Sequence, residues 1–286
     1  MDHRELWKTI FGDTDEYIDF YFREKAAWSK IYSKYDGNEL VSMAFFTPYE
    51  MVYRGRECIC PCIVGVATRK EYRHRGYMRE ILKRGLAEAA GSGSPVAFLS
   101  PVNEKIYEPL GFQGVQCRTG LEVTGLRRKY YEVRAFLDLG QDEKERVAEF
   151  ASKRLRVSGF DLYRKHNVAY YELLQKEMEA LGGRVAVLWE GGGIRGIVSY
   201  IHEDESYEVT EVICDVCNGQ RVVETVCAYV AAGEPARVVF SDGEYLGQVT
   251  GAGIVRKREK KPYTMLFDLE ENGKTGGLHV YINDIT

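Results

Sequence analysis

The chain has 286 residues, a formal net charge of −4 and a sequence pI of about 5.9. Hydrophobic residues make up 45% of it and charged residues 29%, which is typical of a globular protein with room for about two domains. This mildly acidic balance argues against a nucleic-acid partner. No apolar run approaches the roughly 20 residues that span a bilayer, and the N-terminus lacks a signal-peptide core. We therefore expect a cytoplasmic protein with no membrane partner.

Residues 2–28 predict two helices joined at Gly12, with Asp13 or Thr14 as the cap of the second. Three acidic residues of the second helix either attract a cationic substrate or form an ordinary solvated face: Asp15, Glu16 and Asp19. An antiparallel meander follows. Its strands are expected at 29–35, 40–47, 49–54 and 58–68.

The seven cysteines are predicted to be reduced and packed. Cys58, Cys60 and Cys62 alternate along one face of a predicted strand. The pair Cys214 and Cys217 has a spacing found in metal and redox sites, but no second pair lies at a useful distance. We therefore expect no metal.

Residues 62–86 predict a buried strand, a short basic turn and an amphipathic helix. The first amides of a helix have no partner within it, and the helix dipole favours an anion there. Gly76 would let the backbone approach that anion closely. Arg73, Arg75 and Arg79 add forked donors suited to phosphate. The pattern predicts a diphosphate site.

This junction resembles the acyl-CoA site of the GNAT superfamily of N-acetyltransferases. The run Arg73-His74-Arg75-Gly76-Tyr77-Met78 follows the family's Gln/Arg-x-x-Gly-x-Gly/Ala pattern except at its last position. Residues 103–112, Asn-Glu-Lys-Ile-Tyr-Glu-Pro-Leu-Gly-Phe, resemble the family's Asn…Tyr-x-x-Leu-Gly-Phe segment. Two motifs in this order are more specific than either alone.

The resemblance implies that acetyl-CoA is the co-substrate. Backbone groups near Val66 and Thr68 would pair with its pantetheine arm, and Asn103 would either contact that arm or cap a short helix. The cofactor-binding residues that the resemblance implies are Val66, Ala67, Thr68, Arg73, His74, Arg75, Gly76, Tyr77, Met78, Arg79 and Asn103.

Tyr107 is the catalytic residue that the resemblance implies. Acetyl transfer from a thioester to an amine produces an oxyanion and then a thiolate. A phenol of pKa about 10 can donate a hydrogen bond or proton to a sulfur whose thiol pKa is roughly 8.5, and a backbone amide on the strand can stabilise the oxyanion. The alternative is a core aromatic beneath Gly111 and Phe112.

Residues 58–64 contain no glutamate, although many family members have their general base on this strand. The string from Val66 to Arg73, with residues 47–49 upstream, is similar to the enhanced-intracellular-survival branch, which has two acetyltransferase-like domains in tandem. In that branch the C-terminal carboxylate is the base, which implies Thr286. Asp284 lies close to it in sequence, and ordered water is the alternative. We expect the branch's sterol-carrier-like third domain to be absent or truncated here.

The second half, from residue 126, repeats the order strand, turn, helix. Its turn at 215–220 lacks arginines, so we expect a degenerate copy that binds no CoA. The basic run 256–261 is interpreted as a solvated segment. Helices are predicted at 142–157, 167–181 and 220–230, and strands at 185–189, 194–202, 207–214 and 238–240.

The predicted fold class is mixed α/β, with tandem GNAT-like domains that each have a mixed, mostly antiparallel sheet flanked by helices. The domains are 1–125, which binds acetyl-CoA and is catalytic, the degenerate 126–270, and a C-terminal tail, 271–286. The predicted function is N-acetyl transfer to a primary amine of a small molecule or peptide. The alternative is a catalytically silent CoA-binding sensor or interaction module. A homo-oligomer is left open.

Overall fold

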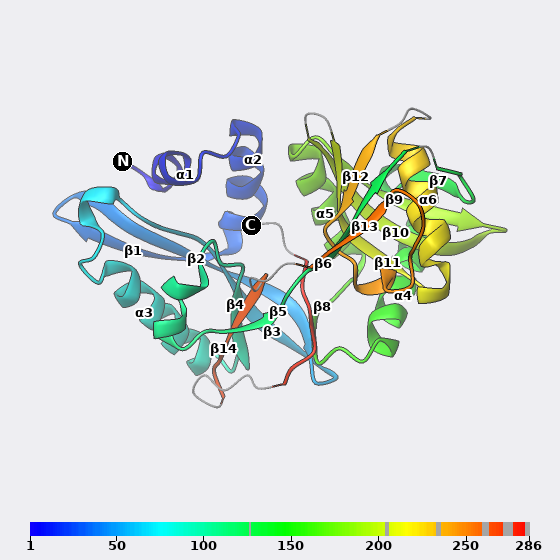
Figure 1. Cartoon of the computed structure of the whole chain (residues 1–286). Helices are drawn as coiled ribbons and strands as arrows, with labels where there is room; N and C mark the ends of the chain where they lie inside the picture. Colours follow the sequence, from blue (N-terminus) through cyan, green and yellow to red (C-terminus); the bar gives the residue numbers. More distant parts are fainter. Residues whose placement is uncertain (126, 204–205, 233–235, 259–262, 271–276, 284–286) are drawn as a thin grey trace.

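The computed structural model describes the chain except residues 126, 204–205, 233–235, 259–262, 271–276 and 284–286. The described residues form two mixed sheets, each flanked by helices and lying side by side (Figure 1). The predicted α/β class is confirmed. No helix in this part of the chain is both long enough and apolar enough to cross a membrane.

The N-terminal helices form as predicted, and Thr14 is the cap of the second, accepting a hydrogen bond from the Tyr17 amide at 3.3 Å. Both helices place buried side chains, Leu6, Trp7 and Ile18 among them, against the first sheet. Their bounds are α1 (His3–Phe11) and α2 (Asp15–Phe20), continued by a π-helical turn, Tyr21–Lys25, and a 3-10 turn, Ala26–Trp28.

The first sheet has the strand order β15-β8-β2-β3-β4-β14-β5, and β1 pairs with β2. β4 runs parallel to β3, because helix α3 (Tyr77–Gly91) connects them. The prediction of two strands within 40–54 is wrong, since one strand continues through Pro48. The strands are β1 (Lys30–Asp36), β2 (Glu39–Tyr53), β3 (Arg56–Thr68), β4 (Val96–Leu99), β5 (Gln113–Gln116), β8 (Leu162–Arg164), β14 (Thr264–Asp268) and β15 (Val280–Tyr281).

The second sheet has the order β13-β6-β12-β11-β10-β9-β7, and it includes the four strands predicted for this half. The three helices predicted for this half also form. Its strands are β6 (Thr119–Thr124), β7 (Glu132–Ala135), β9 (Arg184–Glu190), β10 (Gly193–Glu203), β11 (Ser206–Cys214), β12 (Arg237–Phe240) and β13 (Ile254–Arg258). The helices of this half are α4 (Gln141–Val157), α5 (Val168–Ala180) and α6 (Gly219–Val230).

The chain crosses between the two sheets several times. β5 belongs to the first sheet and β6, directly after it, to the second. β8 returns to pair with β2, and β14 inserts between β4 and β5. The domain boundaries at residues 125 and 270 remain a prediction. The observed pairing shows that each sheet contains strands from both predicted domains.

A buried ion pair joins the two halves. The Nζ atom of Lys25, at the end of the π-helical turn, lies 2.6 Å from Oε1 of Glu177 on α5. The two side chains are only 1% and 2% exposed. An unpaired charge at such a site is costly, because neither water nor a counter-ion replaces the lost partner.

Replacing Lys25 by methionine should therefore lower the free energy of unfolding by about 3–5 kcal/mol. The double variant Lys25→Met/Glu177→Leu should recover a large part of the loss, since no charge is then left buried. Urea unfolding measures both. The control is Lys176→Met, which breaks the neighbouring, exposed Lys176–Glu24 pair and should change stability by less than about 1 kcal/mol. Equal losses for Lys25→Met and Lys176→Met would contradict this account.

Candidate active site

The candidate site lies where β3 and β4 separate. These strands are parallel, but their register pairs only Cys62 with Phe98. β4 ends at Leu99, whereas β3 continues to Thr68. Within the described chain, Val66, Ala67 and Thr68 have no partner strand on the β4 side. Backbone groups normally find hydrogen-bond partners, so this free edge of β3 can pair with an extended ligand.

β3 is also irregular just before this free edge. Its register with β2 passes from Ala67–Met43 to Val64–Phe45, so β3 carries one extra residue. Gly65 lies in this bulge with φ +61, and a Cβ there would lie 2.5 Å from the Trp7 ring. A bulge turns backbone groups out of the ladder, where they can contact a ligand. The sequence analysis missed this feature, although a glycine within an apolar strand is a signal for it.

α3 begins immediately beyond the basic turn, as predicted. Gly76 is its N-cap residue with φ +80, a conformation that favours glycine, and no described side chain caps the helix. A Cβ on Gly76 would meet no protein atom within 4 Å. The first amides of α3, at Tyr77, Met78 and Arg79, donate no hydrogen bond to any described residue, so they can bind an anion.

Cationic side chains surround this helix end. Arg73 donates from Nε to the Thr68 carbonyl oxygen at 3.2 Å, and Arg75 donates from Nη2 to that of Glu71 at 3.0 Å. All of the arginines that the sequence singled out here are exposed, and Arg79 has no hydrogen bond or ion pair within the described chain. Such weakly held guanidinium groups can turn toward a bound phosphate.

The remaining residues of the turn have mixed surroundings. His74 is exposed and has a φ of +63, which helps the chain to turn before the helix. The ring of Tyr77 lies 5.5 Å from the Lys34 ammonium. Met78 packs against the core beneath α3, so its amide rather than its side chain is available at the site.

Tyr107 lies between two 3-10 turns, Glu104–Ile106 and Glu108–Leu110, where the sequence predicted a short helix. Its ring packs edge-on against Phe112 with centroids 5.9 Å apart, and its hydroxyl makes no hydrogen bond to any described residue. Burial raises the pKa of this phenol to about 12. The hydroxyl is thus a protonated donor at neutral pH.

Asn103 caps the first of these turns, because its Oδ1 accepts a hydrogen bond from the Lys105 amide at 3.1 Å. The capping interpretation is confirmed, and a CoA contact from this exposed side chain remains a prediction.

A cavity of about 10 Å³ marks the fork between β3 and β4. Ser100 donates a hydrogen bond from Oγ to the Tyr263 carbonyl oxygen at 2.9 Å in its wall. The C-terminal segment reaches this cavity through Ile282, while Asp284 and Thr286 lie outside the described residues. The lining residues are Cys62, Phe98, Leu99, Ser100, Tyr263, Thr264 and Ile282.

In the second sheet the corresponding fork, between β11 and β12, is filled. Asp242 follows β12, and its Oδ2 accepts hydrogen bonds from the Val212 amide at 3.0 Å and the Tyr281 hydroxyl at 2.6 Å. Burial raises the pKa of this carboxyl group. Protein groups thus occupy the backbone edge that an extended ligand would need, which supports the prediction that this half binds no CoA.

Two further sets of predicted residues have ordinary surroundings. Asp15 and Asp19 form exposed ion pairs with Lys8 and Arg4 of α1, which favours the solvated-face interpretation. Of the cysteines, Cys58 and Cys60 have their Sγ atoms 3.6 Å apart, and all seven are free thiols. Cys117 and Cys217 are exposed, so the prediction that they are packed is wrong. No metal-binding cluster of His, Cys, Asp or Glu occurs among the described residues.

Comparisons with known proteins agree with this geometry. Residues 2–115 match a family model described as an acetyltransferase (GNAT) domain. A search of curated proteins found no match. Among solved structures, a probable N-acyltransferase from Enterococcus faecalis, itself described as a conserved protein of unknown function, has a TM-score of 0.72 at 16% identity. The likeness covers 94% of this chain and 70% of that one.

Two other solved structures are similar over nearly the whole chain. A GCN5-related N-acetyltransferase from Anabaena variabilis has a TM-score of 0.68 at 13% identity, covering 93% of this chain and 69% of that one. Eis1 from Mycobacterium abscessus has a TM-score of 0.61 at 12% identity, covering 94% and 70%. At these identities the likenesses show a shared GNAT-type fold, and membership of the tandem branch remains a prediction.

The surroundings of Tyr107 predict an unusual titration. Because the folded-state pKa of about 12 exceeds the usual value of about 10, the unfolded phenol ionises first, and Tyr107 should reduce stability as pH rises through this range. Ultraviolet difference titration of the folded wild type against Tyr107→Phe isolates this phenol. The difference between the two titrations is the tyrosinate signal of Tyr107, and its midpoint should lie near pH 12. A midpoint near pH 10 would show that the hydroxyl is solvated instead.

Proposed function

We propose that this protein is an N-acetyltransferase that moves an acetyl group from acetyl-CoA to a primary amine of a small molecule or peptide. The observation that carries the proposal is the uncapped N-terminus of α3 at Gly76, placed just beyond a strand whose edge is free. The family match over residues 2–115 supports acyl transfer as the general class.

The two halves of acetyl-CoA match two parts of the site. The diphosphate would accept hydrogen bonds from the first amides of α3, with Arg73, Arg75 and Arg79 turning toward it. The pantetheine arm would run along the free edge of β3 and pair with backbone groups near Val66 and Thr68. This path leads the thioester toward the fork between β3 and β4.

The chemistry is direct attack of the amine on the thioester. The amine nitrogen forms a bond to the carbonyl carbon, the carbon–sulfur bond breaks, the nitrogen loses a proton and the CoA sulfur gains one. The neutral phenol of Tyr107 is suited to give that proton or a hydrogen bond to the sulfur. An amide of the β3 bulge near Gly65 would stabilise the oxyanion.

The proton that leaves the amine needs an acceptor, and residues 58–64 of β3 contain no carboxylate. We propose the terminal carboxylate at Thr286 for this role. Its support is Ile282, which lies in the wall of the fork cavity four residues earlier. A relay through ordered water is the alternative.

Acetyl-CoA binding tests the diphosphate site through a matched pair of glycines. Gly76 and Gly93 both have φ +80, and a methyl group added to either would meet only open space, so alanine strains the backbone equally at the two positions. By calorimetry, Gly76→Ala should weaken acetyl-CoA binding about tenfold or more through loss of amide contacts. Gly93→Ala should leave the affinity unchanged. Equal affinities for the two variants would place the diphosphate elsewhere.

Turnover tests the role of Tyr107. With a panel of primary amines, Tyr107→Phe should lower kcat by about 10²–10⁴ while acetyl-CoA affinity is kept, because only proton donation is removed. Tyr35→Phe, which changes an exposed tyrosine of β1, is the control and should keep full activity. Release of free CoA thiol is the measurement. Tight acetyl-CoA binding with no thiol release for any amine would favour the catalytically silent sensor instead.

A further inference from the structure

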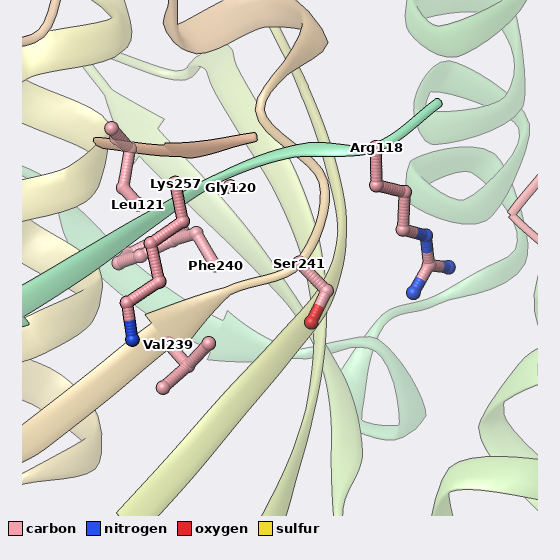
Figure 2. Close-up of a pocket in the computed structure, with 7 residues that line it drawn as sticks. All are labelled: Arg118, Gly120, Leu121, Val239, Phe240, Ser241 and Lys257. Carbon is pink, nitrogen blue, oxygen red and sulfur yellow. The ribbon is translucent and has the colours of Figure 1, made fainter. Parts of the chain in front are cut away.

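A larger hollow lies on the second sheet, close to the point where the chain crosses from the first. Its volume is about 410 Å³, within the range of small-molecule sites. It spans β6, β12 and β13, and Figure 2 shows Lys257 and Arg118 well apart with Ser241 between them. The lining residues are Arg118, Gly120, Leu121, Val239, Phe240, Ser241 and Lys257.

One position of β6 in the wall of the hollow has no side chain. Gly120 pairs with Lys257 on β13, and a Cβ on it would lie 2.6 Å from the Phe240 carbonyl oxygen. A larger residue is therefore excluded. Val239 and the strand backbones supply a mainly apolar lining, which suits the carbon chain of a small molecule.

Arg118 is the unusual residue of the hollow. Its guanidinium stacks on the Tyr263 ring, 3.3 Å from the centroid. Its Nε and Nη2 atoms are buried and have no hydrogen-bond acceptor among the described residues. A buried donor without an acceptor costs about 1–3 kcal/mol, so a shift of this side chain that brings the two nitrogens to an anion in the hollow would be favoured. A guanidinium prefers a carboxylate or phosphate, which accepts two hydrogen bonds at once.

The other charges at the hollow partly cancel. Lys257 pairs with Glu122, which also accepts a hydrogen bond from Arg237 at 2.8 Å, and Ser241 donates to Glu208. The hydrogen bonds from Arg237 and Lys257 lower the pKa of Glu122 to about 2, so this carboxylate stays ionised. Among these described residues, the three cations Arg118, Arg237 and Lys257 stand against the two carboxylates of Glu122 and Glu208.

The Arg118–Tyr263 stack connects the hollow to the acyl-transfer site. Tyr263 also lines the fork cavity together with Cys62 and Ser100. The same aromatic residue thus lies in the wall of the fork and against the guanidinium of the hollow. An acceptor seated in the hollow would reach the thioester by extending past this stack.

We infer that the hollow binds the acidic end of the acceptor, which is an amine carrying a carboxylate or phosphate-like group, with Arg118 as its anion-binding residue. This inference rests on the proposed acetyl transfer. It disfavours polyamines and aminoglycosides as acceptors, because a second ammonium group would lie beside an unpaired guanidinium.

Pairs of amines that differ only in the acidic group test the inference. β-Alanine, γ-aminobutyrate and ε-aminocaproate are compared with propylamine, butylamine and hexylamine, and aminopropylphosphonate distinguishes phosphate-like from carboxylate recognition. Putrescine represents the polyamines. At saturating acetyl-CoA, at least one acid should exceed its neutral counterpart at least tenfold in kcat/KM, and putrescine should be the poorest. The best chain length reports the distance from Arg118 to the thioester.

Variants show whether Arg118 causes the preference. Arg118→Met should lower the acid-to-neutral ratio of kcat/KM to about one while the acetyl-CoA affinity is unchanged. Arg118→Lys should restore part of the preference for the acid. Lys257→Met, at the exposed end of the hollow, provides a second variant should Arg118→Met fail to fold, and should reduce the ratio. Lys153→Met removes an exposed cation of α4 and is the matched control, with no effect expected.

Equal kcat/KM values within every pair, or a ratio that survives Arg118→Met, would overturn the inference and leave acetyl transfer standing. Failure of acetyl-CoA to bind would instead reject the proposed function. In that case, calorimetric titration with ε-aminocaproate and with caproate alone tests whether the hollow binds an anion. Binding that Arg118→Met abolishes supports an anion site, and no such binding rejects it.

Discussion

The candidate site depends on a single constraint, the divergence of β3 from β4 after one paired position, Cys62 with Phe98. Without this divergence, the backbone groups at the edge of β3 would pair with β4. The N-terminus of α3 could then bind an anion, but the rest of a long ligand would have no free strand edge to pair with. The second sheet shows the contrast, because Asp242 and Tyr281 fill the corresponding fork. One sheet keeps backbone groups free at its fork, whereas in the other the side chains of Asp242 and Tyr281 satisfy them.

Strands exchanged between the halves surround this fork. β14 comes from the far end of the chain and inserts between β4 and β5, so the first sheet is incomplete without it. Tyr263, just before β14, contacts Arg118, just before β6, and Ile282 lines the fork cavity. The proposed acceptor side is therefore assembled from segments that are distant in sequence, whereas residues 62–86 contain the proposed contacts to the diphosphate and to the pantetheine arm. A fold of this kind can keep one acyl donor and change its acceptor by changes in the second half.

This division explains what the sequence could predict. The strand, the glycine and the amphipathic helix of residues 62–86 are local signals, and the structure forms them as expected. The crossing strands β6, β8 and β14 were not predicted, because they are short and their partners lie far away in sequence. Arg118 gave no local signal either, since its burial against Tyr263 arises only from tertiary packing. Tyr107 was identified through a motif, and its raised pKa required the surrounding core.

The most direct test of the central claim is a crystal structure of the protein with CoA. The account predicts diphosphate density at the amides of Tyr77, Met78 and Arg79, with the pantetheine arm paired along β3 and its sulfur at the fork beside Cys62. The side chains of Asp242 and Tyr281 should remain in the β11–β12 fork. CoA bound along β11 and β12 instead, or a β3–β4 fork that excludes the pantetheine arm, would contradict the account.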